Sequence, residues 1–138
     1  MVEMDVHYEG NLHCRGTHGP SGAELATDAP LDNQGLGESF SPTDLLATAL
    51  GSCMLTVMGI TARSRGWALE GSSARVEKHM VKDPERRIGR IALTMKMAPG
   101  LPVECHDVLE DAARTCPVAR SVHPGIELDL HFDWSTSS

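Results

Sequence analysis

The long stretch from Leu45 to Ala62, which contains no charged side chain, constrains this chain more than any other feature. Ser41 precedes it as an N-cap, Pro42 suits the first helical position, and Asp44 completes a capping box. A helix is therefore predicted from Ser41 to about Arg65. Such a helix is apolar on nearly every side and must be covered on most of them.

A second copy of the chain is the expected cover for this helix. A chain of 138 residues has little other apolar structure with which to surround it. Small residues in the first half of the helix would let a second helix approach closely; they are Ala47, Ala49, Gly51 and Ser52. The sequence therefore predicts a homodimer.

The same stretch also reaches the length of a transmembrane segment. It contains three threonines, two glycines and a serine, so its mean hydropathy is modest and a buried helix is the favoured interpretation. The N-terminus is acidic and lacks the apolar run of a signal peptide. We therefore expect a cytoplasmic protein that does not associate with membranes.

Alternation of apolar and polar residues predicts strands before and after the helix. The N-terminal strand is expected to bury one face, formed by Val2, Met4, Val6 and Tyr8. Alternation resumes at Leu12 and Cys14, and further strands are expected over residues 22–27, 74–80, 91–97 and 126–134.

A second helix is predicted to start near Pro102, and Pro117 interrupts it before one more helical turn. The apolar stripe of this helix consists of Cys105, Leu109, Ala112 and Cys116. Strands, a long helix, strands, a helix and a strand together make an α+β fold. The length favours a single domain over residues 1–138.

The charge of the chain argues against a nucleic-acid partner. Its formal net charge is −7, whereas binding to phosphates needs a clustered excess of lysine and arginine. One basic cluster, Arg86, Arg87 and Arg90, follows an Asp-Pro turn and is interpreted as the solvated edge of a hairpin.

The four cysteines, Cys14, Cys53, Cys105 and Cys116, form no CxxC pair. In a chain without a signal peptide they are interpreted as free thiols rather than a structural disulfide framework. Histidines near Cys14 and beside Cys105 raise the alternative of a zinc site, but the compact ligand pairs that structural zinc prefers are missing. No metal is expected.

The segment from Gly37 to Trp67, with SPTDLLATALGSCMLTVMGI at its centre, resembles the OsmC family. That family has a cysteine deep in a long central helix and a second cysteine in a Cys-Pro motif about sixty residues later. Here Cys116-Pro117 follows Cys53 by 63 residues. With the order of the predicted elements, the resemblance covers nearly the whole chain.

The resemblance implies an intertwined homodimer, in which an antiparallel sheet wraps the long central helix and the active sites lie at the subunit interface. In the peroxidase branches, the first cysteine attacks a hydroperoxide and the second resolves the resulting sulfenic acid as a disulfide. A dithiol reductant then regenerates the enzyme, with no metal or organic cofactor. By this resemblance, Cys53 and Cys116 are the catalytic pair in a response to oxidative stress.

Polar partners of the thiol are also implied by the resemblance. The peroxidase branches use an arginine from the N-terminal strands, and Arg15 is the sole arginine before the helix. Glu38, in the loop before the helix, is the candidate to orient Arg15. Those branches carry a glutamate ten residues before the first cysteine; Thr43 occupies that position here, and its neighbour Asp44 is interpreted as a capping residue.

Two functions therefore remain open at this stage. One is a thiol-dependent organic hydroperoxide reductase. The other is a protein of the same family that senses redox state or binds a small molecule without efficient turnover. Consumption of thiols by peroxide distinguishes them.

Overall fold

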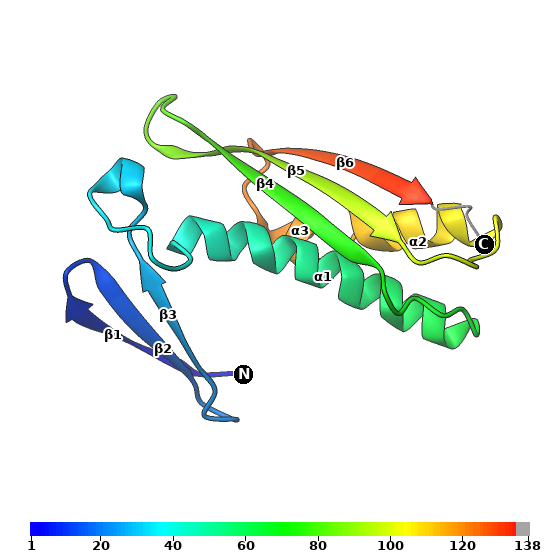
Figure 1. Ribbon diagram of the computed structural model, residues 1–138, viewed down its shortest axis with the longest axis horizontal. Helices are drawn as coiled ribbons and strands as arrows, with labels where there is room; N and C mark the ends of the chain where they lie inside the picture. The colour runs from blue at the N-terminus through cyan, green and yellow to red at the C-terminus, as the bar shows by residue number, and fades with distance from the viewer. Residues whose placement is uncertain (135–138) are drawn as a thin grey trace. The chain divides into compact units, whose positions relative to one another are not determined.

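The chain builds two small three-stranded sheets and a long helix, so the predicted α+β class is confirmed (Figure 1). The computed structural model describes residues 1–134. These fall into two compact units, one comprising Met1–Leu46 and the other starting at Ala47. The single domain expected over residues 1–138 stays a prediction.

The N-terminal unit contains an antiparallel sheet in the order β1-β2-β3, with β1 at Met4–Gly10, β2 at His13–His18 and β3 at Glu24–Asp28. A short 3-10 helix, η1, follows at Leu31–Asn33. The expectation that β1 buries its apolar face is wrong for the single chain, because Met4, Val6 and Tyr8 are 59–69% exposed. Within residues 1–46, no second layer covers that face of the sheet.

Helix α1, at Pro42–Ser64, begins with the predicted capping box. The Asp44 N–H donates to Ser41 Oγ at 3.0 Å, and the Ser41 N–H donates to the Asp44 carboxylate at 2.9 Å. By length and composition α1 also qualifies as a membrane-spanning helix, with 33% of its most apolar window buried. Its buried residues are Ala47, Leu50, Gly51, Met54, Met58 and Ala62.

Not all the small residues of α1 face outward, where they could let a second helix approach as expected. Gly51 is buried against β4 (Ser73–Val81), where a Cβ would lie 2.9 Å from Val76 Cγ2. Ala47 is buried as well, whereas Ala49 and Ser52 are exposed. Gly51 therefore lets α1 approach its own sheet, and only Ala49 and Ser52 remain available to a second helix.

The C-terminal sheet has the order β4-β5-β6, with β5 at Arg87–Met97 and β6 at Glu127–Trp134. Strands β4 and β5 are antiparallel, but β6 runs parallel to β5. The expected antiparallel sheet is thus corrected to one antiparallel and one mixed sheet. The reason is that α2 (Cys105–Arg114) and α3 (Pro117–Ser121) carry the chain back to the end of the sheet where β5 began.

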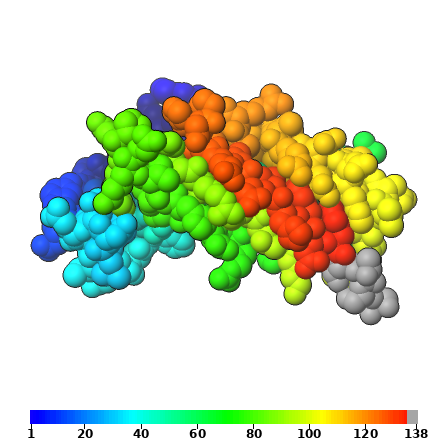
Figure 2. All heavy atoms as spheres, turned by 90° about the horizontal axis from the view of Figure 1, so that it is seen from above, coloured from blue at the N-terminus to red at the C-terminus, as the bar shows by residue number. Residues whose placement is uncertain are grey.

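Helix α2 packs inward through Cys105, Leu109 and Ala113 rather than the expected Ala112. A spacing of four residues places these three on one face. The Trp134 Nε1–H of β6 donates to Glu110 at 2.8 Å, and the Trp134 ring stacks on His106 with 4.1 Å between centroids. In Figure 2, β6 accordingly lies alongside α2 and α3, which are coloured yellow to orange. These contacts fix α2, the helix that leads to Cys116.

Candidate functional site

Cys53 lies in the middle of α1, at the edge of the helix face that packs on the core. Its side chain is partly buried. Beside it runs an exposed, uncharged stripe of α1, formed by Ala49, Ser52, Thr56 and Ile60. The thiol therefore lies between a packed face and an open face of the same helix.

Cys116 stands between α2 and α3 and is only 1% exposed. It is the N-cap of α3, and its sulfur accepts a hydrogen bond from the Ala119 N–H at 3.4 Å. Pro117 suits the first position of α3 because its missing N–H needs no partner there. The expected capping role of Cys116 is confirmed.

The thiols of Cys53 and Cys116 interact, although 63 residues separate them in the sequence. Burial raises the pKa of Cys116, and the Ala119 N–H only partly offsets this effect. The neighbouring Cys53 side chain, and its charge when it is a thiolate, raise the pKa further. The N–H groups of α3 were expected to favour a Cys116 thiolate, but burial outweighs them. A thiolate at Cys53 therefore makes ionisation of the Cys116 thiol less favourable.

The raised pKa of Cys116 predicts a loss of stability in alkaline solution. A thiol whose pKa is higher in the folded chain stabilises it fully below the unfolded value, which is about 9, and less as the pH rises through the folded value. The unfolding temperature should therefore decline above about pH 9, and decline less in Cys116→Ser. Calorimetry across this pH range tests the prediction, with Cys14→Ser as the control. Identical alkaline declines in the wild type and Cys116→Ser would contradict it.

Arg15 lies on β2 in the N-terminal unit, where two carboxylates hold it. Its Nε lies 3.0 Å from Glu9 Oε2, and its Nη1 lies 3.6 Å from Glu24 Oε2. The hydrogen bond and charge of Glu9 raise the pKa of Arg15, and Glu24 adds to the effect. Successive residues of a strand point to opposite faces, so Arg15 lies on the polar face, opposite Gly16. Its charge is thus balanced within its own sheet.

Glu38 is exposed in the loop between β3 and α1, and among residues 1–134 the carboxylates that pair with Arg15 are those of Glu9 and Glu24. The role of Glu38 as a partner of Arg15 stays a prediction. Its backbone N–H donates to the buried Asp28 carboxylate at 3.0 Å. Sequence reasoning missed Asp28, whose signal was an acidic residue at the end of a strand, just before a loop with proline and two glycines.

The two remaining cysteines lie elsewhere. Cys105 is fully buried on α2, as predicted for a core residue, and burial raises the pKa of its thiol. Cys14 is partly buried on β2. Within residues 1–134, no group of three or more histidine, cysteine, aspartate or glutamate side chains is placed to hold a metal ion.

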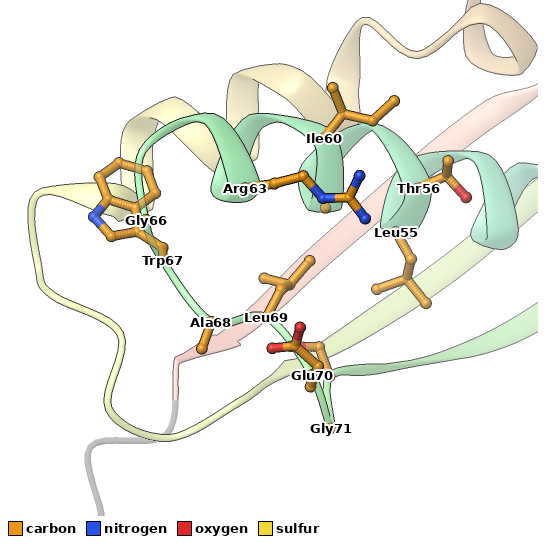
Figure 3. Close-up of a pocket in the computed structure, with 12 residues that line it drawn as sticks. Leu55, Thr56, Ile60, Arg63, Gly66, Trp67, Ala68, Leu69, Glu70 and Gly71 are labelled. Atoms are coloured by element: carbon orange, nitrogen blue, oxygen red, sulfur yellow. The ribbon is translucent and has the colours of Figure 1, made fainter.

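An open groove of about 670 Å³ lies at the C-terminal end of α1, between the helix and the loop that leads to β4 (Figure 3). Leu55 and Leu69 give it an apolar lining, and Arg63 and Glu70 place opposite charges at its walls. It shares Thr56 and Ile60 with the exposed stripe of α1, but neither Cys53 nor Cys116 lines it.

Comparison with known proteins gives a consistent family. The family model described as OsmC-like protein matches residues 35–131. A Psychrobacter arcticus protein named for an osmotic stress induced and detoxification response is 43% identical, with a TM-score of 0.90 over 96% of both chains. No curated protein matches the sequence.

Two organic hydroperoxide resistance proteins share the fold. The one from Legionella pneumophila is 19% identical, with a TM-score of 0.76 over 96% of both chains. The one from Elizabethkingia anophelis is 15% identical, with a TM-score of 0.77 over 98% of this chain and 96% of its own. At these identities the similarity shows a shared fold alone.

Proposed function

The chain belongs to the OsmC-like protein family, and we propose that it is a cytoplasmic, thiol-dependent reductase of organic hydroperoxides that acts in the response to oxidative stress. The observation that carries the proposal is the interaction between the thiols of Cys53 and Cys116. Two structurally similar proteins named for organic hydroperoxide resistance support the choice of substrate class.

In the proposed reaction, the Cys53 thiolate attacks the terminal oxygen of the hydroperoxide and the O–O bond breaks. The alkoxide takes a proton and leaves as an alcohol, while Cys53 becomes a sulfenic acid. The Cys116 sulfur then attacks the Cys53 sulfur, water leaves, and a disulfide forms. An external dithiol reduces this disulfide to two thiols and is itself oxidised to a disulfide.

The different environments of the thiols support this division of roles. Cys53 is partly exposed beside an open helix face, so a small peroxide reaches it. Cys116 is buried, and its raised pKa keeps it protonated and unreactive toward peroxide. In the proposed reaction it becomes the resolving nucleophile once Cys53 is oxidised and a base removes its proton.

Arg15 and Glu38 are the proposed polar partners of the Cys53 thiolate. The middle of a helix provides no free N–H groups to stabilise an anion, so a cation must come from another element. To stabilise the Cys53 thiolate, the Arg15 guanidinium must release Glu9 or Glu24, or must use N–H donors that these two carboxylates leave free.

The proposed assembly is an intertwined homodimer with its active sites at the subunit interface. Its support is the apolar surface that each unit leaves exposed: Met4, Val6, Tyr8 and Leu25 in the N-terminal unit, and Ile60 with the uncharged stripe of α1 in the other.

Turnover of organic hydroperoxide and of hydrogen peroxide, with an excess dithiol reductant, tests the proposed function. The wild type should reduce the organic hydroperoxide catalytically, and Cys53→Ser should fall to the uncatalysed background because the nucleophile is lost. Cys14→Ser, which changes a cysteine outside the proposed pair, should keep wild-type activity. A wild type with no turnover above the uncatalysed background would overturn the proposal in favour of a redox-sensing or ligand-binding protein of the same family.

A further inference from the structure

Asp28 is an unusual acidic residue in the N-terminal unit because its side chain is only 1% exposed. It ends β3, and with Ser41 it is one of two buried polar residues among residues 1–134. A buried carboxylate is costly unless it is paired and hydrogen-bonded. The partners of the Asp28 carboxylate therefore indicate which part of the chain it stabilises.

Both oxygens of Asp28 are engaged. Oδ2 accepts the backbone N–H of Glu38 at 3.0 Å, and Oδ1 lies 3.4 Å from Nδ1 of His13, its neighbour across the β2–β3 ladder. The Glu38 N–H lowers the pKa of Asp28, burial opposes this, and His13 lowers it further. The carboxylate is therefore ionised at neutral pH and bonds strongly to the Glu38 N–H.

These contacts hold residues 29–40 in place. These residues form the loop that connects β3 to α1, which we call the strap. The Asp28 N–H donates to Phe40 O at 3.0 Å, so the strap returns to the strand from which it left. At its turn, a Cβ on Gly35 would lie 1.7 Å from Ala29 O, a position that only glycine tolerates. Glu38, one of the proposed site residues, is thus held through its backbone while its side chain remains exposed.

We propose that Asp28 is a positioning residue for the peroxidase reaction: it fixes the backbone of Glu38 so that the Glu38 carboxylate is presented in one orientation, three residues before the N-cap of α1. This role rests on the proposed function, because it concerns a residue of that same site. Asp28 acts only through Glu38 and touches neither peroxide nor thiol.

Substitutions of Asp28, with a control substitution in the same sheet, test the role. Asp28→Ala removes the acceptor and should lower kcat for organic hydroperoxide by about tenfold or more, since small misplacements of site groups are costly. Asp28→Asn keeps an oxygen for the Glu38 N–H and should recover most of that loss. Asp5→Ala, which removes an exposed aspartate from the same sheet, should leave kcat unchanged. Should Asp28→Ala fail to fold by circular dichroism, Asp28→Glu, whose carboxylate is displaced by one methylene, should show the same fall in kcat.

Two readouts separate positioning from general stability. Amide hydrogen exchange at Glu38 should accelerate in Asp28→Ala but not in Asp28→Asn, while amides of β2 keep their protection. In a Glu38→Ala background, Asp28→Ala should cause no further loss of kcat, because both changes act on one group. Additive losses, or an Asp28→Ala protein with wild-type kcat, would overturn the role alone. A wild type without turnover would instead overturn the proposed function, and this role with it.

Discussion

One equivalent of an organic hydroperoxide is expected to consume two thiols per chain and to leave a disulfide between Cys53 and Cys116. The two side chains already interact, and a disulfide needs Cα atoms within about 7 Å or a small backbone movement. Free-thiol titration gives the stoichiometry, and peptide mapping without reductant identifies the cross-link. A Cys53 that does not react, or that is joined to Cys14 or Cys105, would contradict the two-cysteine mechanism.

In Cys116→Ser, the same treatment with hydroperoxide should leave a different product. Without a resolving thiol, Cys53 should remain as a sulfenic acid that a dimedone-type reagent traps, and excess peroxide should oxidise it to the irreversible sulfinic form. Turnover with a dithiol should fall sharply after the first cycles as overoxidised protein accumulates. Cys105→Ser is the matched control, because it removes another buried cysteine and leaves the proposed pair intact.

Local sequence signals predicted the elements of this fold well. The Ser41–Asp44 capping box and the uncharged stretch after it located α1, and alternation located β4, β5 and β6. The direction of β6 was missed because alternation is the same in parallel and antiparallel strands; only the path of the crossover decides it. The shift from Ala112 to Ala113 reflects a choice between two adjacent alanines that sequence periodicity did not resolve.

The sequence indicated the residues of the candidate site only through the resemblance to the family. Nothing in the local pattern indicates that Cys53 approaches Cys116, because the two residues are brought together by packing on the same core. The apolar stripe placed Cys116 on the inward side of the second helix, but the raised pKa of its thiol depends on how fully the thiol is buried, which periodicity does not measure. Asp28 was missed for a similar reason, since an acidic residue at the end of a strand is usually exposed.

A mass of twice 14.9 kDa is expected for the protein in solution. In the single chain, α1 leaves Ala49, Ser52, Thr56 and Ile60 exposed with no charge among them. A helix face that meets water normally carries charged residues. The apolar face of the N-terminal sheet makes a second uncovered surface, with Val6 69% and Leu25 51% exposed. Surfaces of this kind mark interfaces rather than free faces of a monomer.

Ile60→Glu tests this assembly most directly. Ile60 is 65% exposed in the single chain, so the substitution removes little packing within the subunit, but a glutamate buried without a partner in an interface costs several kcal/mol. Sedimentation equilibrium at micromolar concentration should therefore give about 30 kDa for the wild type, twice the chain mass, and a shift toward 14.9 kDa for Ile60→Glu. The control is Val103→Glu, which places the same charge at a residue 77% exposed just before α2 and should leave the dimer intact. A stable, folded wild-type monomer at these concentrations would remove both the dimer and the interface site that depends on it.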